Sequence, residues 1–101
     1  MIDLSLDPPH DEAAERAILG AMLKDPEDAI PQVLEFLREE DFYLEEHRLL
    51  FSLLFKLWEE KGKDWDEIVL RDYIKKHGLE NKISMDFIYS LLDEAVHGTL
   101  L

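Results

Sequence analysis

The sequence contains no cysteine, so it offers neither a disulfide nor thiol chemistry. It has four glycines, at positions 20, 62, 78 and 98, and their spacing matches neither GxxxxGK nor GxGxxG, the loops that hold nucleotide phosphates. No apolar run is long and uninterrupted enough to span a membrane, and the first residues lack the basic and apolar regions of a secretory signal. These absences exclude several classes of protein and favour a cytoplasmic location.

Basic residues are also scarce. The 101 residues include 11 Lys and Arg against 24 Asp and Glu, which gives a formal net charge of −13. Such a surface repels phosphate backbones, so direct binding of nucleic acid by this domain is not expected, and no run of Lys or Arg suggests an anionic membrane. The single Asn and single Gln beside many Glu and Lys fit a heat-adapted source.

The most apolar stretch runs from His47 to Lys61 and predicts a helix in the centre of the domain. Its apolar side chains cover about two-thirds of the helix circumference, so neighbours should contact it on two or three sides. Most of the helix should be core. Three aromatic residues form the one edge that could instead face a partner: Phe51, Phe55 and Trp58.

A first helix is predicted from a cap at Asp11 to about Lys24. Its apolar periodicity places two sets of residues on separate faces, namely Ala14, Ala17, Ile18, Ala21 and Met22 on one and Leu19 and Leu23 on the other. The small residues, with Gly20 among them, should allow a neighbouring helix to approach closely.

Further helices are predicted on both sides of the central one. Asp25-Pro26 starts a second helix that Pro31 should kink or interrupt, and Asp66 and Ser84 cap a fourth and a fifth. No strand pattern is found. The prediction is an all-α compact orthogonal bundle of about five short helices around the apolar helix 47–61, with an extended arm over residues 1–10, the domain over 11–97 and a short tail over 98–101.

No constellation of side chains predicts catalysis, a cofactor site or a metal site. The histidines at positions 10, 47, 77 and 97 are far apart, and none is three or four residues from another. Neighbouring carboxylates such as Glu39–Glu40 are typical of a solvated face in a chain this acidic.

Three short motifs nevertheless stand out along the chain. The first is Pro-His, an acidic residue and hydrophobic-Leu-Gly, the second is Asp-Phe-Tyr followed by His-Arg, and the third is Gly with Asp four residues later. The residues that carry them here are Pro9, His10, Ala14, Glu15, Ile18, Leu19 and Gly20, then Asp41, Phe42, Tyr43, His47 and Arg48, then Gly62 and Asp66. Their order and spacing cover nearly the whole chain and resemble those of one family, the N-terminal domain of DnaB-type replicative DNA helicases.

From the residues alone, these motif positions indicate structural roles. Gly20 permits helix contact, Phe42 and Tyr43 plug the core, and Asp66 caps a helix. His47 and Arg48 either hydrogen-bond the preceding acidic loop, for example at Asp41, or form an exposed pair.

The resemblance implies a non-catalytic assembly and docking module. Members of the family continue with a helical hairpin, a linker and a RecA-like ATPase domain, and form hexamers whose N-terminal domains make a collar of three dimers. The implied partners are other helicase subunits, the C-terminal domain of a DnaG-type primase, and a helicase loader or initiator. ATP and Mg²⁺ belong to the family's ATPase domain. We expect this chain to be a fragment that neither hydrolyses ATP nor unwinds DNA.

Two other classes of function remain open at this point. An unrelated acidic helical adaptor explains the composition equally well but leaves the ordered motifs unexplained. A small enzyme that uses carboxylates and a divalent metal predicts a cleft with converging acids and stabilisation by the metal.

Overall fold

The computed structural model describes residues 11–97, and every regular element within them is helical. The α-helices are α1 (Glu12–Lys24), α2 (Pro26–Phe36), α3 (Glu45–Lys61), α4 (Glu67–Lys76) and α5 (Met85–His97), with a 3-10 turn, η1 (Glu39–Asp41), before α3. The predicted all-α class and number of helices are confirmed. The predicted arm and tail, together with Pro9, His10 and Gly98, lie outside the described residues.

Local capping signals explain where three of the helices begin. A free N–H in the first turn finds an oxygen on the side chain just before the helix, as predicted. The backbone N–H groups of Ala14, Val69 and Phe87 donate to the side chains of Asp11, Asp66 and Ser84, at 3.1, 3.0 and 3.1 Å.

The predicted interruption at Pro31 was wrong, because α2 is continuous from Pro26 to Phe36. Proline lacks the N–H that would bond the carbonyl of Glu27 one turn earlier, so one helical hydrogen bond is lost. Glu27 is exposed, so water can solvate that carbonyl. The buried Ile30 holds the helix on the core from the same turn.

The two apolar faces that the sequence placed on α1 are not equally buried. Ala14, Ala17 and Ala21 are exposed. The buried residues instead follow a spacing of four, three and one, which places one carboxylate among apolar neighbours: Glu15, Leu19, Met22 and Leu23. Periodicity allowed both faces, and the larger side chains occupy the buried one because they remove more apolar surface from water.

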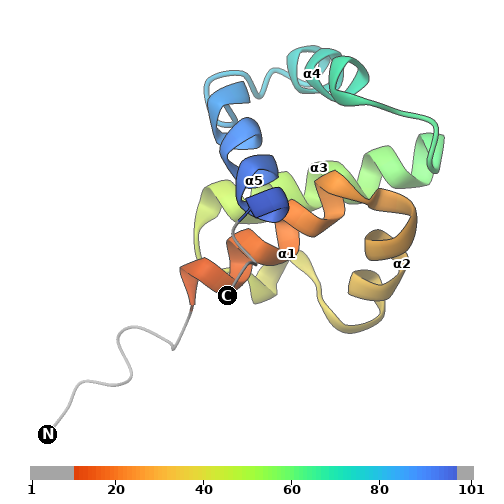
Figure 1. Cartoon of the computed structure of the whole chain (residues 1–101). Helices are drawn as coiled ribbons and strands as arrows, with labels where there is room; N and C mark the ends of the chain where they lie inside the picture. The colour runs from red at the N-terminus through yellow and green to blue at the C-terminus, as the bar shows by residue number, and fades with distance from the viewer. Residues whose placement is uncertain (1–10, 98–101) are drawn as a thin grey trace, which may run out of the picture.

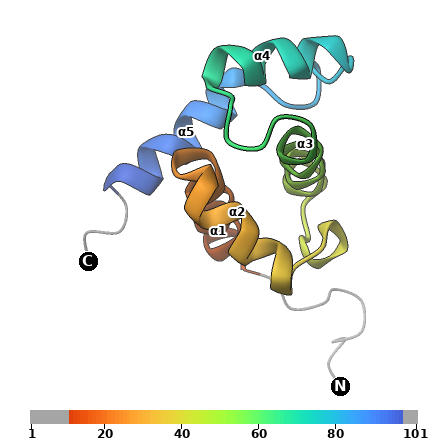
Figure 2. The same ribbon diagram turned by 90° about the vertical axis from the view of Figure 1, so that its right-hand side faces the viewer.

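Helices α1 and α3 together organise the domain. Helix α3 packs against α1, η1 and α4, and α1 also packs against α2 and α5. Figure 1 shows α1 crossing α3, and Figure 2, which looks along α3, shows α4 on the side away from α1 and α2. The central helix therefore has contacts on several sides, as predicted, although it begins at Glu45 rather than His47.

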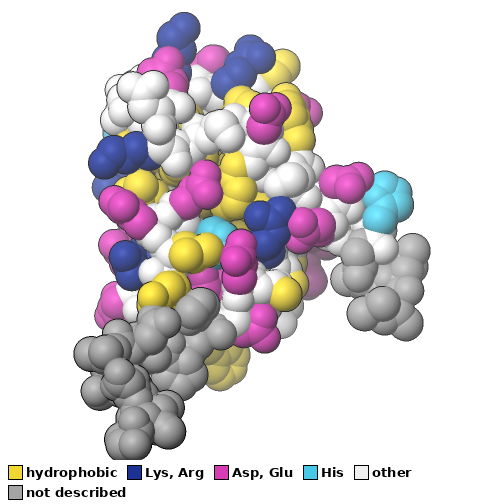
Figure 3. Space-filling model, turned by 90° about the vertical axis from the view of Figure 1, so that its left-hand side faces the viewer, with side chains coloured by type: hydrophobic (Ala, Val, Ile, Leu, Met, Phe, Trp, Pro, Cys, Tyr) yellow, Lys and Arg dark blue, Asp and Glu magenta, His cyan; other side chains and the backbone are white. Residues whose placement is uncertain are grey.

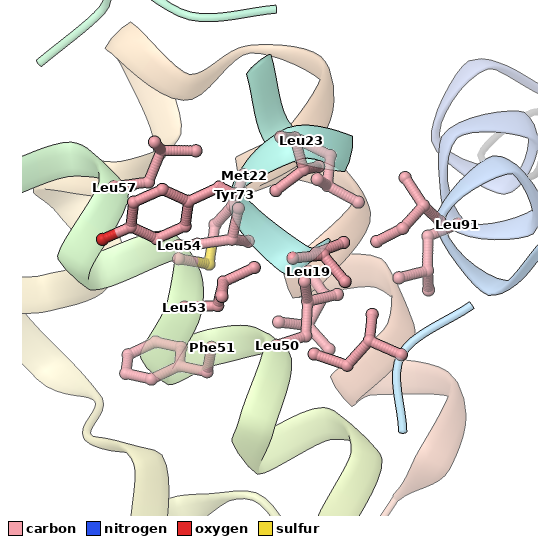
Figure 4. Close-up of a cluster of buried hydrophobic side chains, with 14 of the residues drawn as sticks. Leu19, Met22, Leu23, Leu50, Phe51, Leu53, Leu54, Leu57, Tyr73 and Leu91 are labelled. Carbon is pink, nitrogen blue, oxygen red and sulfur yellow. The ribbon is translucent and has the colours of Figure 1, made fainter. Parts of the chain in front are cut away.

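The core fills the space where these helices meet. Leucines of α1 and α3 face one another, and side chains from α4 and α5 close the cluster (Figure 4). Leu19, Leu50, Leu54, Leu57 and Leu91 have no exposed surface.

Candidate functional site

A buried carboxylate and a buried imidazole join α1 to α3. Oε1 of Glu15 lies 2.7 Å from Nδ1 of His47, and these residues are 8% and 1% exposed. Since an ionised carboxylate only accepts hydrogen bonds, the ring N–H donates to it. Oε2 of Glu15 accepts the backbone N–H of Tyr43 at 2.8 Å. We call Glu15, His47 and the Tyr43 backbone the interlock, because one carboxylate ties α1 to α3 and to the segment before it.

Hydrogen bonds keep this carboxylate charged. Burial by itself would raise the pKa of Glu15, but the N–H of Tyr43, the hydrogen bond and charge of His47, and the backbone of Leu44 outweigh it. The pKa of Glu15 is therefore lowered from its ordinary value of 4.5. The interlock is a strongly accepting site, and the hydrogen bonds that its carboxylate accepts come from within the chain.

The interlock should make the domain sensitive to acid. Because the folded pKa of Glu15 lies below 4.5, the stabilisation it provides is present above that pH and is lost as the pH falls through the lower folded value. Urea denaturation at a series of pH values should show that Glu15→Gln removes part of the loss of stability below pH 4.5. Glu12→Gln, in the same turn but exposed, should keep the wild-type slope.

The predicted contact of His47 and Arg48 with Asp41 was wrong, and so was the alternative of an exposed pair. Nη1 of Arg48 donates to the carbonyl oxygens of Phe42 and Tyr43, at 3.2 and 3.1 Å. Asp41 accepts the backbone N–H of Arg38 at 2.8 Å, which closes η1. The His-Arg pair does hold the preceding segment, but through Glu15 and through backbone carbonyls.

Phe42 behaves as the predicted core plug, whereas Tyr43 does so only in part. Phe42 is 2% exposed, and its ring centroid lies 4.9 Å from that of Phe51. Tyr43 is half-buried and joins the interlock through its backbone.

A second polar contact joins α1 to α5. The guanidinium of Arg16 binds both carboxylate oxygens of Glu94, with Nη2 at 2.6 Å from Oε2, and also donates to Oγ of Ser90 at 2.8 Å. The ring of Phe87 lies under this guanidinium at 5.8 Å and stacks on His47 at 5.7 Å. Neighbouring residues 15 and 16 thus fasten α1 to two different helices.

Removing the Arg16 contact should cost less than removing the interlock. Its partner Glu94 is 48% exposed, so water screens the pair, and Arg16→Ala should lower the free energy of unfolding by about 1 kcal/mol. Lys63→Ala removes an exposed ion pair with Glu27, whose atoms are 3.8 Å apart, and should change the free energy of unfolding by less than about 0.3 kcal/mol. Chemical denaturation measures both free energies of unfolding. Equal losses in Arg16→Ala and Lys63→Ala would contradict this expectation.

At Gly20, α1 and α5 approach closely. A Cβ built there would lie 2.8 Å from the carbonyl oxygen of Leu91 and 3.3 Å from Cβ of Ala95. The predicted role in helix contact therefore applies to Gly20, whereas Ala17 and Ala21 remain exposed.

The predicted aromatic edge is divided by the fold. Phe51 is 3% exposed and belongs to the core, Trp58 is half-buried, and Phe55 is 37% exposed. Of the three, Phe55 has the most surface for a partner. Other large apolar side chains are more exposed and were not singled out from the sequence, namely Phe36, Ile68, Tyr89 and Val96.

The described histidines and carboxylates are dispersed. His77 packs against the ring of Tyr73, and His97 lies 3.2 Å from Asp93. Over residues 11–97, no three His, Asp or Glu side chains come together in a way that could hold a metal ion. In the same residues, no helix has the length and apolar character needed to cross a membrane.

This arrangement defines an all-α domain whose motif residues hold its helices together. Comparison with known proteins agrees with that class. The family model for the DnaB-like helicase N terminal domain matches residues 7–99. The chain belongs to this family, and the matched domain is the non-catalytic part of the helicase.

Curated relatives support the assignment. The chain is similar to proteins named replicative DNA helicase DnaB, at 37% identity over 71 residues in Leifsonia xyli subsp. xyli (strain CTCB07), 36% over 81 in Mycobacterium leprae (strain TN) and 37% over 82 in Rhodothermus marinus. These matches cover 70%, 80% and 81% of this chain and 15%, 13% and 8% of the relatives. The chain thus corresponds to a small part of their length. With the family assigned, the two alternatives, an unrelated adaptor and a carboxylate enzyme, lose their support.

Proposed function

We propose that this chain acts as the assembly and docking domain of a hexameric replicative DNA helicase in the cytoplasm. Its tasks would be to help organise the N-terminal collar of the ring and to receive the C-terminal domain of a DnaG-type primase and a loading factor. The observation that supports this most is the match of nearly the whole chain to the N-terminal domain of DnaB-like helicases. ATP and Mg²⁺ would act in the ATPase domain of the complete helicase.

The distribution of polar and apolar groups is compatible with a docking role. The motif residues described above are used inside the domain, where they join helices. The surface carries many carboxylates, which Figure 3 shows spread over one face with Lys and Arg between them. An acidic surface with exposed aromatic residues favours basic partners and a salt-dependent affinity.

A calorimetric titration with the C-terminal domain of the cognate primase tests this function. We expect saturable binding that weakens as the salt concentration rises, because opposite charges would meet in a solvated interface. No heat of binding to this chain or to the full-length hexamer would contradict the primase part of the proposal.

A further inference from the structure

An apolar groove lies at the corner where α2, η1 and α3 meet. It encloses about 310 Å³, and Leu34, Phe51 and Phe55 form its apolar floor. Figures 1 and 2 show this corner at the connection between α2 and α3. Its volume falls in the range of about 300–1,000 Å³ typical of ligand pockets, so it can accept a few apolar side chains. Phe55, 37% exposed, is the aromatic surface available there.

The charged side chains on the rim of the groove that remain available to a partner are acidic. Glu39 and Glu40 line the groove and are exposed. Within residues 11–97, neither carboxylate forms an ion pair or a hydrogen bond. The third charged rim residue, Arg38, donates to the carbonyl oxygens of Leu34 and Leu37 at 2.9 and 3.0 Å. Its guanidinium is thus directed at the end of α2, and the two carboxylates are left to meet a cation.

We propose that this groove, bounded by Leu34, Phe55, Glu39 and Glu40, docks a basic amphipathic helix of a partner protein. The helix would place a Leu or Phe against Phe55 and a Lys or Arg one turn away beside the carboxylates. This inference rests on the proposed function, because it takes another protein as the partner. It adds which surface the partner binds and which kind of helix the partner presents. A second copy of this chain fits poorly, because it carries the same net charge of −13.

The probe is a fluorescent peptide of about four helical turns with Leu on one face and Lys on the other, titrated into the full chain. Its acidic twin has Glu in place of Lys. We expect the basic peptide to bind, with NMR shifts concentrated at Leu34, Ser52 and Phe55, and the acidic twin to bind at least about tenfold more weakly. Equal binding of both peptides, or shifts centred on another surface, would overturn the proposal.

Variants at the groove provide a second test. Phe55→Ser should weaken peptide binding by about tenfold, because it removes the apolar anchor. Ile68→Ser is the matched control, since Ile68 is 55% exposed on α4 and outside the groove, and it should stay within about twofold. Glu39→Lys with Glu40→Lys should also weaken binding, whereas the same charge change at Glu59 and Asp72 should do so less.

Sedimentation and the primase titration separate this inference from its alternatives. A wild-type dimer that Phe55→Ser dissociates would overturn the proposal, because the groove would then serve contacts between copies. If the primase domain does not bind but the peptide fills the groove, the primase assignment fails and the groove proposal stands. If the primase domain binds and the peptide does not bind at the groove, the proposed function stands and the groove proposal fails.

Discussion

Replacing Glu15 by alanine should lower the free energy of unfolding by about 3 kcal/mol, as expected when one partner of a buried charged pair is removed. His47, 1% exposed, and the N–H of Tyr43 would lose their acceptor in a place that water does not reach easily. For a domain of this size, such a loss is a large part of the total stability. Urea denaturation measures it.

The matched control is Glu12→Ala, which removes an exposed carboxylate from the first turn of the same helix. It should change the free energy of unfolding by less than about 0.5 kcal/mol. A double-mutant cycle with His47→Ala should also show coupling, because the two side chains share one hydrogen bond. A loss below about 1 kcal/mol in Glu15→Ala, or additive effects in the cycle, would show that the interlock does not hold the domain together.

Gly20→Ala should destabilise the domain by about 2 kcal/mol, although alanine is the better helix former. The added methyl group would meet the backbone carbonyl of Leu91 at 2.8 Å, and a backbone group cannot rotate away as a flexible side chain can. Helix α5 would have to move away from α1, which would also disturb the contact between Arg16 and Glu94. Thermal and chemical denaturation measure the change.

Ala21→Gly is the control for helix propensity. Ala21 is exposed on α1, so this change should follow propensity alone and cost about 1 kcal/mol. Both substitutions would thus destabilise the domain, because glycine is the better residue at position 20 and alanine the better one at position 21. A more stable Gly20→Ala variant would contradict the close packing of α1 on α5.

The sequence predicted best what depends on neighbouring residues. Asp11, Asp66 and Ser84 each bind an N–H three residues later, and such contacts repeat wherever a helix begins. The apolar richness of α3 predicted its contacts on several sides for a similar reason, since burial follows from composition and period. The resemblance to the helicase family came from short motifs whose order and spacing together were informative.

Contacts between distant residues could not be predicted in the same way. Glu15 and His47 are 32 residues apart, and nothing local indicates which acid the histidine meets. One signal was present, because Glu15 is one turn before Leu19 on what proved to be the apolar face of α1. A carboxylate in such a position needs a buried partner, and that expectation would have directed attention to the interlock.

The aromatic edge of α3 illustrates a second limit. Phe51 and Phe55 are one turn apart and equivalent by period, yet one is 3% exposed and the other 37%. The difference arises because the ring of Phe42, the residue directly after η1, packs against Phe51. The position of that connection is a tertiary property, so the sequence could name the edge but not the residue that remains on the surface.

We propose that the motif residues maintain the fold while the surface of the domain binds partners. The most direct test is a calorimetric titration of wild type and Glu15→Gln with the C-terminal domain of the cognate primase, at a temperature where both variants are folded. We expect saturable binding by both, with equal dissociation constants per folded molecule. No binding by the wild type, or a weaker affinity of folded Glu15→Gln, would contradict it.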